Sequence, residues 1–320
     1  MSTPRSEPGA GNDGTDKTTA EYLTRRVAGK DGVELTIDVW LPEQRLQGPE
    51  RPGFVLVHGL ASNARLYDGV ARALVGAGHG AATVDLRGHG RSAKPDSGYD
   101  YDTMCADLAA VLEALVIDPG RDFFERPVVV GQSFGGNLVL ELAARYPDKL
   151  SGVACIDGGT IDLGERFATW DEVSSALAPP KIEGARWEEV RGRFSEMHPD
   201  WPEAGIRGAL ANFEVRDDGT VAPFLTFDRH LAILRAMWER RTKDLFSNVH
   251  VPVLLLPAES PDAPAAWTAD KHSSTQSALS ELERAEVHWF SPADHDVHAQ
   301  HPDEVAAVLL AASRGLFASS

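Results

Sequence analysis

Short apolar runs alternate with amphipathic segments over the first half of the chain. In the segment 102–116, five apolar residues recur on one helical face, and Asp102 stands where it can cap the start of that helix. A second helical pattern covers 63–75, and a third, 136–146, is stopped by Pro147. The apolar runs between these patterns are 54–57, 81–84, 128–130 and 153–156. This rhythm predicts a parallel sheet flanked by helices.

Strands are also predicted at both ends of the chain. Residues 22–41 have the pattern of two strands, with the turn signal Lys30-Asp31-Gly32 between them, and therefore predict an antiparallel hairpin. Near the other end, 253–256 and 286–290 predict two more strands. Pro302 then opens a last helix at a position where its missing N–H costs nothing.

The alternation stops between residues 160 and 248, where the pattern becomes helical and irregular. We expect 160–248 to be a helical cap inserted into a core made of 19–159 and 249–320, and 1–18, which has no apolar run, to be a disordered leader. The aromatic residues of the cap either form an apolar chamber over the site or pack as the cap's own core. They are Trp170, Trp187, Trp201, Trp238, Phe167, Phe194, Phe213, Phe224 and Phe227.

Composition and charge indicate which binding partners and which cellular location to expect. The 320 residues carry a formal net charge of −17, which opposes binding to nucleic acid and to anionic membrane surfaces. No stretch approaches the roughly 20 apolar residues that span a bilayer, so a cytoplasmic location is expected. Cys105 and Cys155, the two cysteines, are expected to be buried and reduced. Assembly into a homo-oligomer stays open.

The clearest chemical signal follows the apolar run 128–130. There the chain reads Gly131-Gln132-Ser133-Phe134-Gly135-Gly136 and continues into a helical pattern. A serine in a sharp strand-to-helix turn is held in a strained conformation with its hydroxyl exposed, and glycines flank it because larger side chains would collide. A Gly-x-Ser-x-Gly string also arises by chance in glycine-rich loops, so its context has to support it.

That context is a resemblance to a known family. With His58-Gly59 and the stretch 85–92, which reads Asp-Leu-Arg-Gly-His-Gly-Arg-Ser, the chain resembles the α/β-hydrolase family over nearly everything after residue 20. The resemblance implies an α/β-hydrolase fold with a mostly parallel eight-stranded sheet flanked by helices and an inserted helical cap. It also implies Ser133 as nucleophile, with the backbone N–H groups of Leu60 and Phe134 as the oxyanion hole. We interpret 85–92 as structural and do not assign His89 as a base.

A serine nucleophile needs a base, and His295 is the histidine chosen for that role. It lies between the last predicted strand and the last helix, in a loop, 294–298, that resembles the family's catalytic-histidine loop. Asp294 stands where the family usually has glycine. His295, His298 and His301 could instead form a metal cluster with acidic neighbours, but no matching ligand group is seen elsewhere, so no metal is predicted.

The acid that orients the histidine has two candidate places. Asp157 follows the strand 153–156 directly, where some relatives, including certain haloalkane dehalogenases and lactonases, carry the acid. The other place follows 253–256, where Glu259 and Asp262 lie but the family's usual glycine is missing. We choose Asp157, although an aspartate before Gly-Gly also suits a plain turn. Asp262 and Glu259 stay open.

These residues together predict a cofactor-free serine hydrolase that cleaves a small apolar carboxylic ester or lactone through an acyl-enzyme. Relatives with aspartate at the nucleophile position open epoxides or cleave carbon–halogen bonds, and Ser133 argues against that chemistry. Carbon–carbon bond hydrolysis and perhydrolysis use the same triad and stay as alternatives. A non-catalytic binding protein with this fold is a third alternative. Loss of a triad residue would have indicated it.

Overall fold

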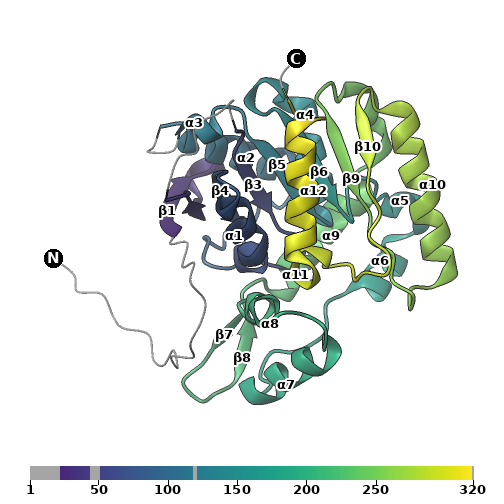
Figure 1. Cartoon of the computed structure of the whole chain (residues 1–320). Coiled ribbons are helices and arrows are strands. Elements are labelled where there is room, and N and C mark those ends of the chain that lie inside the picture. The colour runs from purple at the N-terminus through teal and green to yellow at the C-terminus, as the bar shows by residue number, and fades with distance from the viewer. Residues whose placement is uncertain (1–21, 44–50, 118–120, 319–320) are drawn as a thin grey trace.

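An eight-stranded sheet forms the centre of the molecule in the computed structural model, which describes residues 22–43, 51–117 and 121–318 (Figure 1). The strand order is β1-β2-β4-β3-β5-β6-β9-β10, with β2 antiparallel to β1 and β4 and all other pairs parallel. The strands are β1 (Tyr22–Ala28), β2 (Glu34–Trp40), β3 (Phe54–Val57), β4 (Ala81–Asp85), β5 (Val128–Gln132), β6 (Gly152–Ile156), β9 (Val253–Leu256) and β10 (Ala285–Val287). The predicted mostly parallel eight-stranded sheet is confirmed. The expected leader 1–18 lies outside the described residues.

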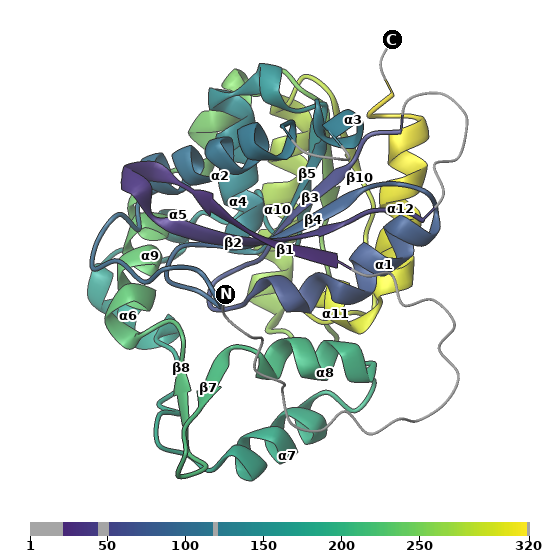
Figure 2. The ribbon, with the colours of Figure 1, turned by 90° about the vertical axis from the view of Figure 1, so that its left-hand side faces the viewer.

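Helices cover both faces of this sheet, which explains why its strands read as continuous apolar runs. Successive residues of a strand point to opposite faces, so Val55 packs with one helical layer and Leu56 with the other. One layer contains α2 (Tyr101–Leu115), α3 (Arg121–Phe124), α4 (Phe134–Arg145) and α10 (Ala265–Glu281); the other contains α1 (Asp68–Gly76), α11 (Val297–Gln300) and α12 (Pro302–Arg314). Figure 2 shows the sheet edge-on between the two layers. The 3-10 turns η1 (Lys30–Gly32), η2 (Ala64–Tyr67) and η3 (Pro147–Lys149) lie in the connections.

Two local predictions are corrected by the structure. Asp102 does not cap α2: Asp100 does, because its carboxylate accepts the backbone N–H of Thr103 at 2.8 Å while its own backbone stays extended. Asp102 pairs with Arg145 instead. The last strand ends at Val287, earlier than expected, and pairing resumes only in an isolated bridge between Ala258 and Phe290. Cys105 and Cys155 are buried free thiols.

Between β6 and β9 the chain leaves the sheet. This part contains α5 (Leu163–Arg166), α6 (Trp170–Leu177), α7 (Trp187–Met197), α8 (Glu203–Leu210), the hairpin β7 (Phe213–Val215) and β8 (Val221–Pro223), α9 (Phe227–Glu239) and the 3-10 turn η4 (Thr242–Asn248). In both views α7, α8 and the hairpin lie below the sheet, away from α2 and α3 (Figures 1 and 2). Among the described residues, no helix is both long and apolar enough to cross a bilayer.

Candidate active site

The sharp turn predicted around Ser133 is present between β5 and α4. Ser133 has φ 53° and ψ −121°, a positive φ that a non-glycine residue adopts only under constraint. A Cβ at Gly131 would lie 2.1 Å from the carbonyl oxygen of Gly135, and a Cβ at Gly135 would lie 2.5 Å from that of His58. The glycines therefore let the strand, the turn and the β3 loop meet behind Ser133, whose side chain lines a cavity.

The two backbone groups predicted as oxyanion donors belong to this turn and to the loop after β3. Phe134 is the first residue of α4, where N–H groups have no partner within the helix, and Leu60 lines the same cavity as Ser133. No described residue accepts a hydrogen bond from the N–H of Leu60 or Phe134. A Cβ at Gly59 would lie 2.4 Å from the side-chain oxygen of Gln132, so the Leu60 loop is pressed onto the serine turn.

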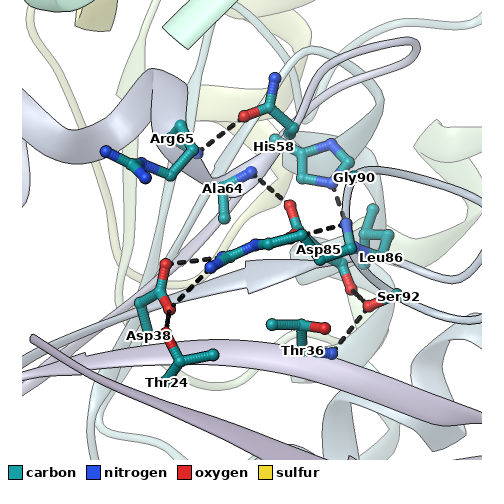
Figure 3. Close-up of polar contacts among 12 residues, drawn as sticks. Thr24, Thr36, Asp38, His58, Ala64, Arg65, Asp85, Leu86, Gly90 and Ser92 are labelled. Atoms are coloured by element: carbon teal, nitrogen blue, oxygen red, sulfur yellow. Dashed lines mark hydrogen bonds and ion pairs between the residues drawn. The ribbon is translucent and has the colours of Figure 1, made fainter. Parts of the chain in front are cut away.

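His58 fixes the orientation of that loop through two ring hydrogen bonds, of which Figure 3 shows the one to Leu86. Its Nε2 accepts the backbone N–H of Leu86 at 3.1 Å, so Nδ1 carries the proton and donates to the carbonyl of Gly59 at 2.8 Å. Burial lowers the pKa of His58 to about 4 against the opposing effect of the Gly59 hydrogen bond, which keeps the ring neutral. In the planar Gly59–Leu60 peptide the carbonyl faces His58, so the Leu60 N–H points away from it.

The stretch 85–92 makes polar contacts with the segment that follows the Leu60 loop (Figure 3). The Asp85 carboxylate accepts the backbone N–H of Ala64 at 2.8 Å and pairs with Arg91 at 3.0 Å. The Ser92 hydroxyl donates to the Asp85 carbonyl at 2.5 Å. His89 is buried with its Nδ1 against the Arg87 carbonyl at 2.9 Å, and it does not line the cavity that contains Ser133.

The structure brings Asp157 and His295 together. Asp157, at the end of β6, has its Oδ2 2.6 Å from Nδ1 of His295, and its Oδ1 accepts the backbone N–H of Ala258 at 2.9 Å. Gln132, beside Ser133, donates to the carbonyl of His295 at 3.2 Å. The His295 ring opens onto the cavity with 53% of its side chain exposed. Ser133, Asp157 and His295 therefore line one cavity.

Asp157 and His295 each stabilise the charged form of the other. Removal from water acts to raise the pKa of Asp157, but the hydrogen bond and charge of His295, together with the charge of Lys271, hold that pKa below its usual range. Removal from water likewise acts to lower the pKa of His295, yet the Asp157 carboxylate outweighs it and the pKa of His295 is raised. An ionised acid beside a histidine of raised basicity is the arrangement a general base requires.

The other two candidate acids lie apart from His295. Asp262 is exposed, and its backbone N–H approaches the Ser260 hydroxyl at 3.4 Å. Glu259 lines the cavity, but its carboxylate is 3.1 Å from Nε2 of His272. Neither contacts His295 within the described part of the chain.

One residue at the site was missed by the sequence reasoning. Lys271, in α10, places its Nζ 2.7 Å from Oδ1 and 2.9 Å from Oδ2 of Asp157. No motif marks this lysine, and it is separated from Asp157 by 114 positions. It could be found only once α10 was placed beside the end of β6.

The three histidines near the end of the chain, His295, His298 and His301, have different neighbours in the structure. His298 is buried against Tyr67, with ring centroids 4.4 Å apart, and burial lowers the pKa of His298 to about 3. His301 lies 3.8 Å from Glu304. Within 22–43, 51–117 and 121–318, no three His, Cys, Asp or Glu side chains gather in a geometry that could hold a metal ion.

The cavity has a volume of about 720 Å³ and lies between the core and the 160–248 segment. Apolar side chains of that segment reach into it: Leu163, Leu177, Leu234, Met237 and Phe246. None of the nine aromatic residues singled out in 160–248, all within the described chain, lines it. Four of them pair with one another, Trp170 with Trp238 at 6.2 Å and Phe194 with Phe213 at 6.0 Å. Trp201 instead packs with Leu66 and Ala299 outside the segment, and Phe227 is 44% exposed. These nine residues therefore do not form the wall of the cavity that Ser133 lines.

Known proteins resemble this chain over most of its length. Residues 54–308 match the model of the alpha/beta hydrolase family. The esterase YbfF of Escherichia coli is 28% identical over 252 residues, which cover 78% of this chain and 89% of that protein. A non-heme chloroperoxidase of Streptomyces lividans is 25% identical over 297 residues, covering 89% of this chain and 98% of that one.

Solved structures show the same fold at lower identity. E-2-(acetamidomethylene)succinate hydrolase superposes with a TM-score of 0.68 at 21% identity, covering 91% of this chain and 98% of the other. The Mycobacterium tuberculosis esterase Rv0045c gives a TM-score of 0.61 at 22% identity, covering 91% of both chains. This protein belongs to the alpha/beta hydrolase family, and the prediction of a hydrolase with the α/β-hydrolase fold is confirmed.

Proposed function

We propose that this protein hydrolyses carboxylic esters, lactones among them, through an acyl-enzyme formed on Ser133. The observation that carries the proposal is the 2.6 Å contact between Asp157 and Nδ1 of His295, in a cavity that Ser133 also lines. The relatives named as esterases support ester bonds as the target. Asp157, and not Asp262 or Glu259, is the acid in this proposal.

The first half of the reaction follows from the tautomer of His295. Because Nδ1–H donates to Asp157, the lone pair on Nε2 is free to take a proton. His295 removes the Ser133 hydroxyl proton as Oγ adds to the ester carbonyl carbon. The carbonyl oxygen becomes an oxyanion, which accepts hydrogen bonds from the N–H groups of Leu60 and Phe134. The intermediate collapses, His295 gives its proton to the leaving alcohol, and the acyl group stays on Ser133.

The second half repeats these steps with water. His295 takes a proton from a water molecule as the water oxygen adds to the acyl carbon, and the same two N–H groups hold the second oxyanion. Collapse breaks the bond to Ser133 Oγ, which recovers its proton from His295, and the carboxylic acid leaves. Hydrogen peroxide in place of water would give a peracid, a second activity favoured by the similarity to the Streptomyces lividans chloroperoxidase.

The cavity favours an uncharged acyl group. Half of the residues that the 160–248 segment contributes to its wall are apolar, and carboxylates outnumber lysine and arginine side chains around the cavity. Two of its cations are already paired, Arg166 with Asp270 at 3.2 Å and Lys243 with Glu165. An anionic substrate would therefore meet net repulsion. In this proposal the 160–248 segment acts as the cap that shapes the acyl pocket.

The proposal is tested with p-nitrophenyl acetate and butyrate, a γ-lactone and a succinate monoester. Wild-type protein should turn over the neutral substrates faster than the anionic monoester, and Ser133→Ala should lose at least about 10⁴-fold in kcat. Ser151→Ala, just before β6 and far from Asp157, is the matched control and should retain activity. Turnover that survives in Ser133→Ala would refute the acyl-enzyme.

A further inference from the structure

Lys271 makes an unusual set of contacts at the end of the sheet. Its ammonium lies 2.7 Å and 2.9 Å from the two carboxylate oxygens of Asp157 and 2.5 Å from the carbonyl oxygen of Ala258. An ammonium has three donors, so all three have an acceptor. Although Lys271 lines the cavity, it is therefore engaged with the protein and is not free to bind a substrate carboxylate.

These contacts complete the coordination of the Asp157 carboxylate. Oδ1 accepts from the Ala258 N–H and from Lys271, and Oδ2 is shared between Lys271 and Nδ1 of His295. The Asp157 side chain is only 4% exposed, so water does not fill these positions. Since Ala258 follows β9 and Asp157 follows β6, the ammonium also ties the ends of two neighbouring strands together.

We propose that Lys271 is a positioning residue that fixes the Asp157 carboxylate against His295 and sets the lower pH limit at which His295 can act as a base. This inference rests on the proposed function of the triad. Lys271 touches no reacting atom: it acts through Asp157.

The effect on His295 follows from the sign of the charges. The imidazolium that forms during catalysis lies beside a carboxylate that Lys271 already neutralises in part. Asp157 raises the pKa of His295 and Lys271 opposes that rise. Among the described lysines and arginines, Lys271 alone lies within ion-pair distance of Asp157. Without it, His295 would stay protonated, and inactive as a base, to a higher pH.

The other titratable groups around the triad do not replace this charge. Asp296 adds to the rise in the pKa of His295. Burial lowers the pKa of His298 to about 3 and that of His58 to about 4, so both are neutral over the working range. The remaining neighbours are engaged elsewhere: Asp294 with Trp201 at 2.9 Å and with His198 at 3.5 Å, and Glu259 with His272 at 3.1 Å.

The test compares pH profiles of kcat/KM for p-nitrophenyl butyrate in four proteins. Lys271→Met removes the charge and keeps the chain length, so the acid limb should move up by about 0.5–1 pH unit. Its kcat at the plateau should fall about tenfold with KM little changed, because Asp157 is less firmly held. Lys271→Arg keeps the charge and should keep the limb of the wild type. Lys149→Met is the control. The Lys149 side chain is as exposed as that of Lys271, and among the described residues Lys149 forms an ion pair only with Glu113, which does not line the cavity.

Circular dichroism and thermal melting confirm that each variant is folded. If Lys271→Met does not fold, Lys271→Gln, which keeps two donors without the charge, serves for the same comparison. An acid limb that coincides with that of the wild type in the uncharged variant overturns the proposal for Lys271 while leaving the triad intact. An inactive wild-type protein that does not label at Ser133 overturns the proposed function itself.

Discussion

Replacement of Asp157 by asparagine should disrupt the hydrogen bonds that hold His295 in place. The carboxylate has donors on both sides: the Ala258 N–H and Lys271 on Oδ1, and His295 and Lys271 on Oδ2. An amide has one oxygen and one NH₂ group, so either orientation sets the NH₂ against a donor. If the NH₂ faces Nδ1, His295 must place its proton on Nε2 and can no longer accept one from Ser133. If the NH₂ group faces Ala258, it lies against the Ala258 N–H and the Lys271 ammonium, so hydrogen-bond donors meet without an acceptor between them.

We therefore expect Asp157→Asn to lower kcat by about 10⁴-fold, equivalent to about 5.5 kcal/mol of lost transition-state stabilisation. The assay is kcat and KM for p-nitrophenyl butyrate, with the folded state checked by circular dichroism. Asp262→Asn, at an exposed position in the same region, is the matched control and should stay within about twofold of the wild type. Asp157 is not the acid if Asp157→Asn keeps more than a tenth of the activity, or if Asp262→Asn is the variant that loses it.

Two further predictions concern contacts outside the triad. Asp294→Ala removes the acceptor of the Trp201 indole N–H at 2.9 Å, which ties the His295 loop to the 160–248 segment; kcat/KM should fall about fivefold, and unchanged steady-state kinetics would disprove that coupling. Arg87→Met leaves the carboxylate of Asp107, which is 1% exposed, without its charged partner; urea denaturation should show a loss of about 3–5 kcal/mol, and a loss below about 1 kcal/mol would contradict the buried pair.

Much of the fold follows from local features of the chain. The apolar run 128–130, the glycines around Ser133 and the helical pattern after it determine the strand, the turn and the helix within one short segment. The prediction of Asp157 uses its place at the end of a strand, since parallel strands bring such ends to one edge of the sheet, together with the resemblance to α/β hydrolases that carry the acid there. The prediction of Ser133 likewise needs the family resemblance as well as the local strand, turn and helix pattern.

Contacts between segments that are far apart in the sequence could not be predicted from the sequence. Lys271 lies on a helix with few buried residues, and nothing in its neighbourhood indicates which strand end it meets. Asp294 departs from the usual glycine of the family, and only the fold shows Trp201 donating to it. The aromatic residues of 160–248 could pack inward or line the cavity with the same pattern, because periodicity gives the buried face of a helix but not its partner.

The proposed reaction requires Ser133 to be an activated nucleophile. Intact-protein mass spectrometry after incubation with a fluorophosphonate, followed by peptide mapping, identifies such a serine. A single adduct on Ser133 is expected, formed much more slowly in Asp157→Asn and absent in Ser133→Ala. A folded wild-type protein that gains no adduct, or that is labelled at another residue, would contradict the proposed reaction.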